Sequence, residues 1–300
     1  MYDVIICGSG PAGMSAALFL RRANLNILIV EKGTPGGKLI STALIENYPG
    51  YIENTGIDLA MIMYRQVKHF KIPYAFSEVM KIEKLGDEHF VVHTKEGDYE
   101  SKMVIRAAGT IAKQIEAEGE EEYVGRGISY CAICDGSFHE KQNVVVIGGG
   151  NSAIEEALYL AKICKKVTII TRGHHFRADP VLMEKVMRAN NVDLVTHHVI
   201  TKFTGKDLLE QVTAKDRDSD NEIVLNVRGA FIYVGFTPSS TLLENFDILD
   251  EDKYIIVDRN CETKVTGLYA AGDCIQKNIR QIATAVADGI TCASAIVRKI

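Results

Sequence analysis

The feature that most constrains this chain is a glycine-rich turn that occurs twice, each time between an apolar run and a helix-like segment. The first copy spans residues 8–13, Gly-Ser-Gly-Pro-Ala-Gly, and follows the apolar run Val4–Cys7. The second spans residues 148–153, Gly-Gly-Gly-Asn-Ser-Ala, and follows Val144–Ile147. In such a turn the glycines permit a tight bend, close approach of a pyrophosphate, and packing of helix on strand. The pair predicts an α/β chain with two Rossmann-like, doubly wound nucleotide-binding domains.

Length and charge are compatible with that prediction. The chain has 300 residues, and at ~150 residues per domain this suggests two domains. Lys and Arg total 34 and Asp and Glu total 39, so the net charge is −5, which argues against a general nucleic-acid binder. No apolar run approaches the ~18 residues of a membrane helix, and no basic segment precedes the first strand. We therefore expect no membrane contact and no signal peptide.

The residue that ends the second strand of each unit contacts the ribose of a bound nucleotide. In the first unit this residue is Glu31, whose carboxylate can bond ribose hydroxyls and repels a 2′-phosphate. In the second unit Thr171 stands at this position, followed by Arg172 and Arg177. The first unit is thus predicted to bind FAD or NAD and the second NADP. The competing interpretation of the two arginines is ordinary surface charge.

Two cysteines precede the second glycine turn, in the run Cys131-Ala132-Ile133-Cys134-Asp135. Such a pair can form and reopen a disulfide by thiolate attack, and the adjacent Asp135 can exchange the proton. A metal site usually needs four ligands; no second such pair exists, and the His174-His175 and His197-His198 pairs lack standard ligand spacing. We expect a redox pair, no metal, and a reducing cytosolic location. The other five cysteines are interpreted as small core residues: Cys7, Cys164, Cys261, Cys274 and Cys292.

Further segments have clear patterns. The acidic segment Glu116–Glu122 is predicted to be a solvated connector, and Phe236–Ser240 is predicted to interrupt the pattern after a strand. Periodicity predicts a helix from about Ile282 to Arg298. The expected strands are Asn26–Val30, Val79–Leu85, His89–Thr94, Met103–Ala107, Val167–Thr171, Ala230–Val234 and Leu268–Ala271.

The chain resembles the low-molecular-weight thioredoxin reductases over essentially all its length. The motifs that carry the resemblance are the two glycine turns, the run Cys131–Gly136, Gly36-Gly37 with Glu46–Gly50, and Ala270–Asp273 with Arg280-Gln281. The resemblance implies a cytoplasmic homodimer that passes electrons from NADPH through FAD and a Cys131–Cys134 disulfide to thioredoxin. It also implies an FAD domain, residues 1–112 and 242–300, interrupted by an NADPH domain, residues 115–239, that carries the cysteines.

The resemblance also implies roles for single residues. Cys134 would face the flavin, Cys131 would attack thioredoxin, and Asp135 would act as acid and base. The residues implied around FAD are Gly8, Ser9, Gly10, Pro11, Ala12, Gly13, Glu31, Lys32, Gly36, Gly37, Lys38, Leu39, Thr42, Asn47, Val79, Ala108, Gly109, Gly272, Asp273, Arg280, Gln281 and Ile282. Those implied around NADPH are Gly150, Asn151, Ser152, Glu155, Arg172, Arg177, Val234 and Gly235.

Two positions depart from the family pattern. Arg172 is followed by Gly173 where the family usually has a second arginine, which predicts a weaker preference for NADPH; Lys38 replaces the usual glutamine. One alternative is a related flavoprotein that uses NADH, ferredoxin or another donor. Two others are a flavin reductase without a disulfide step, and a regulatory module that senses NADP. The cysteine pair argues against both of these, and the intact second glycine turn argues against a ferredoxin donor.

Overall fold

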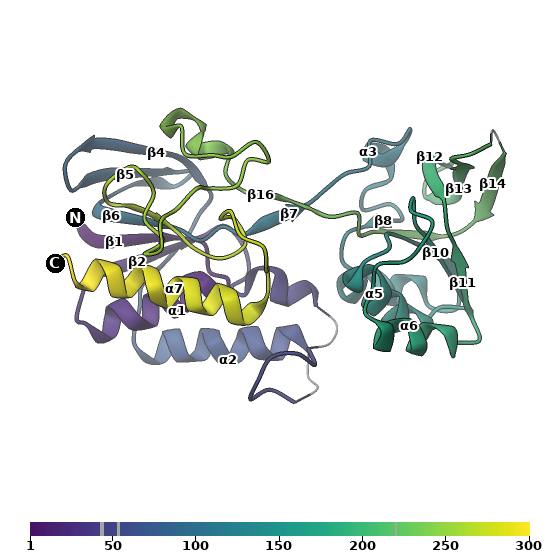
Figure 1. Ribbon diagram of the computed structural model, residues 1–300, viewed down its shortest axis with the longest axis horizontal. Helices are drawn as coiled ribbons and strands as arrows, with labels where there is room; N and C mark the ends of the chain where they lie inside the picture. The colour runs from purple at the N-terminus through teal and green to yellow at the C-terminus, as the bar shows by residue number, and fades with distance from the viewer. Residues whose placement is uncertain (43–44, 53–54, 220) are drawn as a thin grey trace. The chain divides into compact units, whose positions relative to one another are not determined.

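The computed structural model describes residues 1–42, 45–52, 55–219 and 221–300, and the chain divides into two compact units (Figure 1). The first contains Met1–Ile40, Ile45–Ile111 and Thr237–Ile300, and the second is built on Ala112–Phe236. The second unit is therefore an insertion in the sequence of the first. The two connecting segments pair as a small ribbon of β7 (Thr110–Ala112) and β16 (Phe236–Pro238), so the expected break at Phe236 is in fact a short strand.

The first unit is built on a seven-stranded sheet in the order β3-β2-β1-β6-β5-β4, with β17 also paired to β6. Strands β3, β2, β1, β6 and β17 run parallel, whereas β4, β5 and β6 pair antiparallel. The strands are β1 (Tyr2–Cys7), β2 (Ile27–Glu31), β3 (Tyr74–Phe76), β4 (Val79–Gly86), β5 (His89–Thr94), β6 (Gly97–Arg106) and β17 (Leu268–Ala270). The helices are α1 (Pro11–Arg22), α2 (Gly56–His69), α7 (Ile282–Val297) and the 3₁₀ turns η1 (Gly37–Ser41) and η3 (Thr241–Phe246).

Alternating side chains of β1 divide the first unit into two cores. Val4 and Ile6 pack with α1 and α7 on one face of the sheet, which is the face that α1, α2 and α7 cover in Figure 1. Ile5 and Cys7 pack on the other face, against residues of β4, β5 and η3. This is the two-residue period expected of a strand buried on both faces. It places the carboxyl end of β1, and so the first glycine turn, at the edge of the sheet where doubly wound folds bind ligands.

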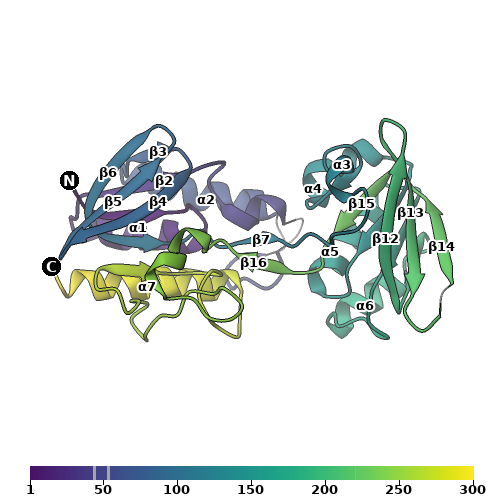
Figure 2. The same ribbon diagram turned by 90° about the horizontal axis from the view of Figure 1, so that it is seen from above.

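The second unit has a five-stranded parallel sheet in the order β11-β10-β9-β15-β8. Helices α5 and α6 pack on one face, and the antiparallel sheet β12-β13-β14 packs on the other (Figure 2). The strands are β8 (Ile128–Ser129), β9 (Asn143–Ile147), β10 (Lys166–Ile170), β11 (Val192–Val195), β12 (His198–Gly205), β13 (Leu209–Asp216), β14 (Glu222–Asn226) and β15 (Gly229–Ile232). The helices are α3 (Glu120–Tyr123), α4 (Ala132–Asp135), α5 (Asn151–Ala161), α6 (Pro180–Met187) and the 3₁₀ turn η2 (Gly136–His139). The prediction of two doubly wound units is confirmed.

The expected solvated connector at Glu116–Glu122 is confirmed for the exposed Glu116, Glu118, Glu121 and Glu122, but it is wrong for Glu120. Helix α3 begins at Glu120, and this side chain is only 2% exposed. Its carboxylate accepts the N–H groups of Ile115 and Glu116, at 3.0 and 2.7 Å, and the hydroxyl of Tyr130 at 2.8 Å. A buried carboxylate is stable when such donors satisfy it, so Glu120 fixes the loop that enters the second unit.

The expected core cysteines are confirmed, since all five free thiols are buried. Burial raises the pKa of Cys7 to about 11 and that of Cys164 to about 11, so these thiols stay protonated at neutral pH. They are therefore poor nucleophiles, because the thiolate is the reactive form. Within the described ranges, no helix is both long and apolar enough to cross a bilayer.

Candidate active site

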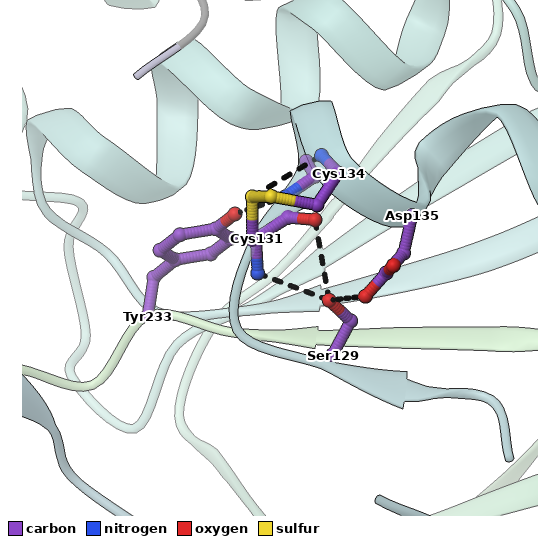
Figure 3. Close-up of a disulfide and its surroundings, with 6 residues drawn as sticks. Ser129, Cys131, Cys134, Asp135 and Tyr233 are labelled. Atoms are coloured by element: carbon purple, nitrogen blue, oxygen red, sulfur yellow. Dashed lines mark hydrogen bonds between the residues drawn. A yellow bond between two sulfur atoms is a disulfide. The ribbon is translucent and has the colours of Figure 1, made fainter. Parts of the chain in front are cut away.

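The centre of the candidate site is a disulfide between Cys131 and Cys134, whose Cα atoms are 5.4 Å apart (Figure 3). Cys131 lies directly before α4 and Cys134 lies within it. The backbone N–H of Cys134 donates to the Sγ of Cys131 at 3.1 Å. After reduction, the same N–H would stabilise negative charge on Cys131, and the thiolate is the nucleophilic form. Cys134 is the more exposed of the two residues, and Cys131 is partly buried.

Ser129, at the end of β8, connects the disulfide to Asp135. Its hydroxyl donates to Oδ2 of Asp135 at 2.6 Å and accepts the N–H of Cys131 at 3.0 Å. The carbonyl of Cys131 is also near, at 3.2 Å, but the single hydroxyl proton serves the shorter contact with Asp135 best. Figure 3 shows Ser129 between Cys131 and Asp135. Ser129 is not among the residues expected from the sequence, although it lies only two residues before the pair.

Tyr233 supports the turn of the disulfide from the opposite side. Its hydroxyl accepts the N–H of Ala132 at 2.8 Å (Figure 3). Burial, and to a lesser degree the charge of Glu156, raises the pKa of Tyr233 well above its usual value, so the hydroxyl is neutral at physiological pH. Tyr233 lies within the strand expected from the sequence, Ala230–Val234, and directly follows the observed β15, but it is 101 residues from Ala132. No local sequence pattern could have indicated this contact.

The second glycine turn packs against the backbone of Tyr233. A Cβ on Gly148 would lie 2.3 Å from the carbonyl oxygen of Tyr233, and φ of Gly148 is +149°, so only glycine fits. Gly150 differs, because an added Cβ would meet no described atom within 4 Å. Packing within the described chain therefore does not explain glycine at 150, whereas close approach of a pyrophosphate does. The disulfide and this predicted nucleotide turn are thus joined through one residue.

The predicted contacts of the second nucleotide lie around this turn. Thr171 is buried beneath Gly149, and Arg172 and Arg177 are exposed. The N–H of Arg177 donates to the carbonyl of Gly149 at 2.6 Å, which fixes this arginine beside the turn. The Asn151 side chain exchanges two hydrogen bonds of 2.8 Å with Asp179. Among the remaining predicted residues, Ser152 and Glu155 lie on α5, and Val234 and Gly235 follow β15.

In the first unit, Glu31 is bonded to the glycine turn itself. Its carboxylate accepts the N–H of Ser9 at 2.8 Å and the N–H of Gly33 at 3.0 Å. The loop after β2 returns to the same place, because the N–H of Gly36 donates to the carbonyl of Ser9 at 2.8 Å. The structure therefore brings three separately predicted elements together: the first turn, the acid at the end of β2, and the Gly36-Gly37 loop.

Lys38 and Asp273 form an ion pair, which sequence reasoning did not predict although it named both residues. Asp273 is well shielded and Lys38 is half-exposed. Arg280 is held nearby, since its guanidinium donates to the carbonyls of Asp273 and Ile275 at 3.2 and 3.3 Å. Lys38 therefore neutralises the carboxylate of Asp273, one of the residues implied around FAD.

Helix α7 begins at Ile282, where the sequence places its start, with Gln281 as its N-cap. The side-chain N–H of Asn47 donates to the side-chain oxygen of Gln281 at 3.3 Å. The other predicted residues are placed as follows: Pro11, Ala12 and Gly13 open α1, Lys32 pairs with Glu78, Leu39 is buried in η1, Thr42 follows η1, Val79 opens β4, Ala108 and Gly109 follow β6, and Gly272 follows β17. Their contacts with a cofactor stay predictions.

The residues present fit a dinucleotide at each turn. The first turn offers Gly10, where an added Cβ would lie 4.0 Å from its nearest neighbour, the Cα of Gly37. It also offers the carboxylate of Glu31 for a ribose. The second turn offers the open side of Gly150 and two exposed guanidinium groups. The carboxylate near the first turn matches an unphosphorylated ribose, and the guanidinium groups near the second turn match a 2′-phosphorylated ribose.

Comparisons with known proteins extend over both units. A family model described as pyridine nucleotide-disulphide oxidoreductase matches residues 2–289. The thioredoxin reductase of Bacillus subtilis (strain 168) is 40% identical over 299 residues, which cover 99% of this chain and 94% of the relative. The crystal structure of Lactococcus lactis thioredoxin reductase matches with a TM-score of 0.96 at 38% identity, and covers 100% of both chains. That of T. acidophilum thioredoxin reductase matches with a TM-score of 0.94 at 34% identity, covering 99% of this chain and 98% of the other.

Proposed function

Because the chain belongs to the pyridine nucleotide-disulphide oxidoreductase family, we propose that it is a thioredoxin reductase that uses NADPH and FAD. The observation that carries this proposal is the Cys131–Cys134 disulfide, which shares a unit with the second glycine turn and is joined to it through Tyr233. A disulfide beside a dinucleotide turn is expected when the disulfide takes part in electron transfer. An isolated structural disulfide would need no such neighbour.

In this proposal the first unit holds FAD, with its pyrophosphate at Gly10 and its adenosine ribose on Glu31. The second unit holds NADPH, with its pyrophosphate at Gly150 and its 2′-phosphate near Arg172 and Arg177. When bound, FAD supplies two-electron transfer between NADPH and the disulfide. The chain's own contribution is to bind and orient the two nucleotides and to control the protons and sulfur atoms of the disulfide.

The sulfur chemistry balances without a further reactant. Reduction breaks the bond between Cys131 and Cys134, and the two sulfurs take up two electrons and two protons. Asp135, oriented by Ser129, is placed to supply one proton. Cys131 then gives up its proton, and its thiolate attacks one sulfur of the thioredoxin disulfide. The thioredoxin S–S bond breaks, a mixed disulfide forms, and the other thioredoxin sulfur leaves and takes up a proton. Cys134 then gives up its proton and attacks Cys131, which restores the enzyme disulfide and releases the second thioredoxin sulfur, so that thioredoxin leaves as a dithiol. The hydrogen bond from the Cys134 N–H to the Cys131 sulfur supports Cys131 as the first attacking group.

Two further properties belong to the same proposal. The enzyme acts in the cytoplasm, where a thioredoxin pool needs continuous reduction, and it is a homodimer, as the family resemblance implies. The electron donor is NADPH, because Arg172 and Arg177 provide positive charge at the second turn. A relative that takes electrons from NADH or ferredoxin is the competing possibility, since Gly173 leaves the arginine set incomplete.

The test is a turnover assay with three donors. Purified yellow protein is mixed with an oxidised bacterial thioredoxin and with NADPH, NADH or reduced ferredoxin, and thioredoxin thiols are measured. The proposal predicts rapid thiol formation with NADPH and much slower formation with the other donors. Thiol formation only with ferredoxin would refute NADPH as the electron donor. Absence of thioredoxin thiols with every donor would refute the thioredoxin reductase function.

A further inference from the structure

Three side chains from separate turns of the second unit come together near Arg172. They are His174 after β10, His197 before β12, and Asp218 after β13. One potential ligand atom of each lies within 4.8 Å of those of the other two. The two imidazole rings are stacked, with centroids 3.9 Å apart and an angle of 11° between their planes. Nε2 of His197 lies 2.9 Å from Oδ1 of Asp218.

Backbone hydrogen bonds hold these turns together independently of the three side chains. The N–H of His197 donates to the carbonyl of Gly173 at 2.9 Å, and the N–H of Arg217 donates to the carbonyl of His197 at 3.0 Å. Asp216 shapes the last turn, because its Oδ1 accepts the N–H groups of Asp218 and Ser219, both at 2.9 Å. These same backbone bonds lower the pKa of Asp216. The two histidines and Asp218 are therefore brought close by the fold itself.

The ring nitrogens of His197 are not satisfied within the described part of the chain. Its side chain is only 13% exposed, and neither Nδ1 nor Nε2 has a hydrogen-bond partner of acceptable geometry. The contact with Asp218 is close, but it is not aligned as a hydrogen bond. A buried polar nitrogen without a partner costs stability, so such groups call for a specific explanation. His197 also has φ of +60°, which a non-glycine residue rarely adopts.

We propose that His174, His197 and Asp218 bind a divalent transition-metal ion of the Zn²⁺ class. Imidazole nitrogen with carboxylate oxygen is a ligand set that suits Zn²⁺. Zn–N bonds of ~2.0–2.1 Å in a tetrahedron place ligand atoms about 3.3 Å apart. The present donors need a modest closure to reach that spacing. His174 can make it, because this residue is exposed and can tilt out of the stack. A fourth position stays open for water.

The surrounding charges limit the affinity without excluding the ion. The Arg217 guanidinium donates to the carbonyl of Arg172 at 3.2 Å, so positive charge lies near the site. Asp216 and Asp218 offset it with two carboxylates. The ligands lie on three different turns, so no ligand-spacing rule could have found the site, and no metal was expected from the sequence. This inference is independent of the proposed function.

The experiment is a calorimetric titration of Zn²⁺ into untagged, oxidised holoenzyme. Keeping Cys131 and Cys134 as a disulfide removes their thiolates as competing ligands. We expect one saturable site per chain. His174→Gln and Asp218→Asn should each weaken Zn²⁺ binding about tenfold or more, because each removes one of three ligands. His175→Gln, the matched control on the neighbouring exposed histidine, should leave the affinity unchanged within about twofold.

The choice of variants keeps the result interpretable. His197→Gln should also abolish the site, but His197 is shielded and this variant could perturb the fold. Asp218 has a side chain that is 75% exposed, so Asp218→Asn leaves the core intact. Thermal unfolding of each variant checks this. Absence of saturable Zn²⁺ binding by the wild type, or equal affinity of Asp218→Asn and wild type, would overturn the proposal.

Discussion

Ser129→Ala is the substitution that most directly probes how the chain controls protons at the disulfide. The hydroxyl donates to Asp135 at 2.6 Å and accepts the N–H of Cys131 at 3.0 Å. Alanine removes both interactions while keeping the backbone of β8. The sulfur atoms and both nucleotide turns are untouched. We therefore expect disulfide reduction to slow while hydride transfer from NADPH to the flavin stays unchanged.

The size of the effect follows from the hydrogen bond to the carboxylate. A hydrogen bond to a charged group contributes ~1.5–3 kcal/mol, and each 1.36 kcal/mol is a factor of ten in rate, so disulfide reduction should slow by about 10- to 150-fold. Because Asp135 is only partly buried, water replaces part of the lost bond, and we expect the lower half of that range. Asp135→Asn should cost more, since general acid–base help is typically ~100- to 10,000-fold.

The assay separates the two steps in time. Enzyme and NADPH are mixed rapidly without oxygen, the flavin colour reports hydride transfer, and quenched alkylation counts the thiols of Cys131 and Cys134. Ser129→Thr keeps the hydroxyl and should recover most of the rate of thiol formation. Wild-type thiol formation in Ser129→Ala would refute the role of Ser129. Equal slowing of both steps would show that the substitution disturbs the fold instead.

Three other predictions concern the cysteines and the two nucleotide turns. Cys131→Ser and Cys134→Ser should each abolish thioredoxin reduction in a turnover assay. NADPH should still bleach the flavin of both variants, because hydride transfer does not involve sulfur. Residual thioredoxin reduction by either variant would contradict the mechanism. Gly173→Arg should raise the NADPH/NADH ratio of kcat/KM about tenfold, chiefly through KM, and Arg172→Ala should lower it, because a guanidinium donates charge-assisted bonds to the 2′-phosphate. A Cβ at Gly173 would lie 3.3 Å from the nearest carbonyl oxygen, so the arginine requires only a small shift of the backbone. An unchanged NADPH/NADH ratio in both variants would show that this loop does not bind the 2′-phosphate. Glu31→Gln should weaken FAD retention during gel filtration, because it replaces a charged ribose acceptor by a neutral one; full retention would refute that role.

The sequence was most informative where function depends on neighbours along the chain. Both glycine turns, the Cys131–Cys134 pair and the start of α7 follow from local patterns, because tight turns, close backbone approach and helix starts are set by a few adjacent residues. The buried strands were also predictable, since runs such as Val144–Ile147 are apolar throughout, as expected of a parallel sheet covered on both faces.

The sequence was least informative where contacts join distant segments. Tyr233 supports Ala132 across 101 residues, and Lys38 pairs with Asp273 across the whole inserted unit. Glu120 looks like its acidic neighbours, and only the packing of the loop shows that it is buried. Nothing local distinguishes these residues, because the partner that gives each one its role lies on another element of the fold.

The most direct test of the account is a count of thiols before and after electron transfer. Oxidised enzyme, NADPH-reduced enzyme, and reduced enzyme mixed with oxidised thioredoxin are each alkylated under native conditions and examined by peptide mass spectrometry. The five buried cysteines should stay unmodified throughout. Cys131 and Cys134 should be labelled in the NADPH-reduced sample and should escape labelling in the sample mixed with oxidised thioredoxin, while thioredoxin gains two thiols. Failure of NADPH to expose these two thiols, or their persistence in the presence of oxidised thioredoxin, would contradict the account.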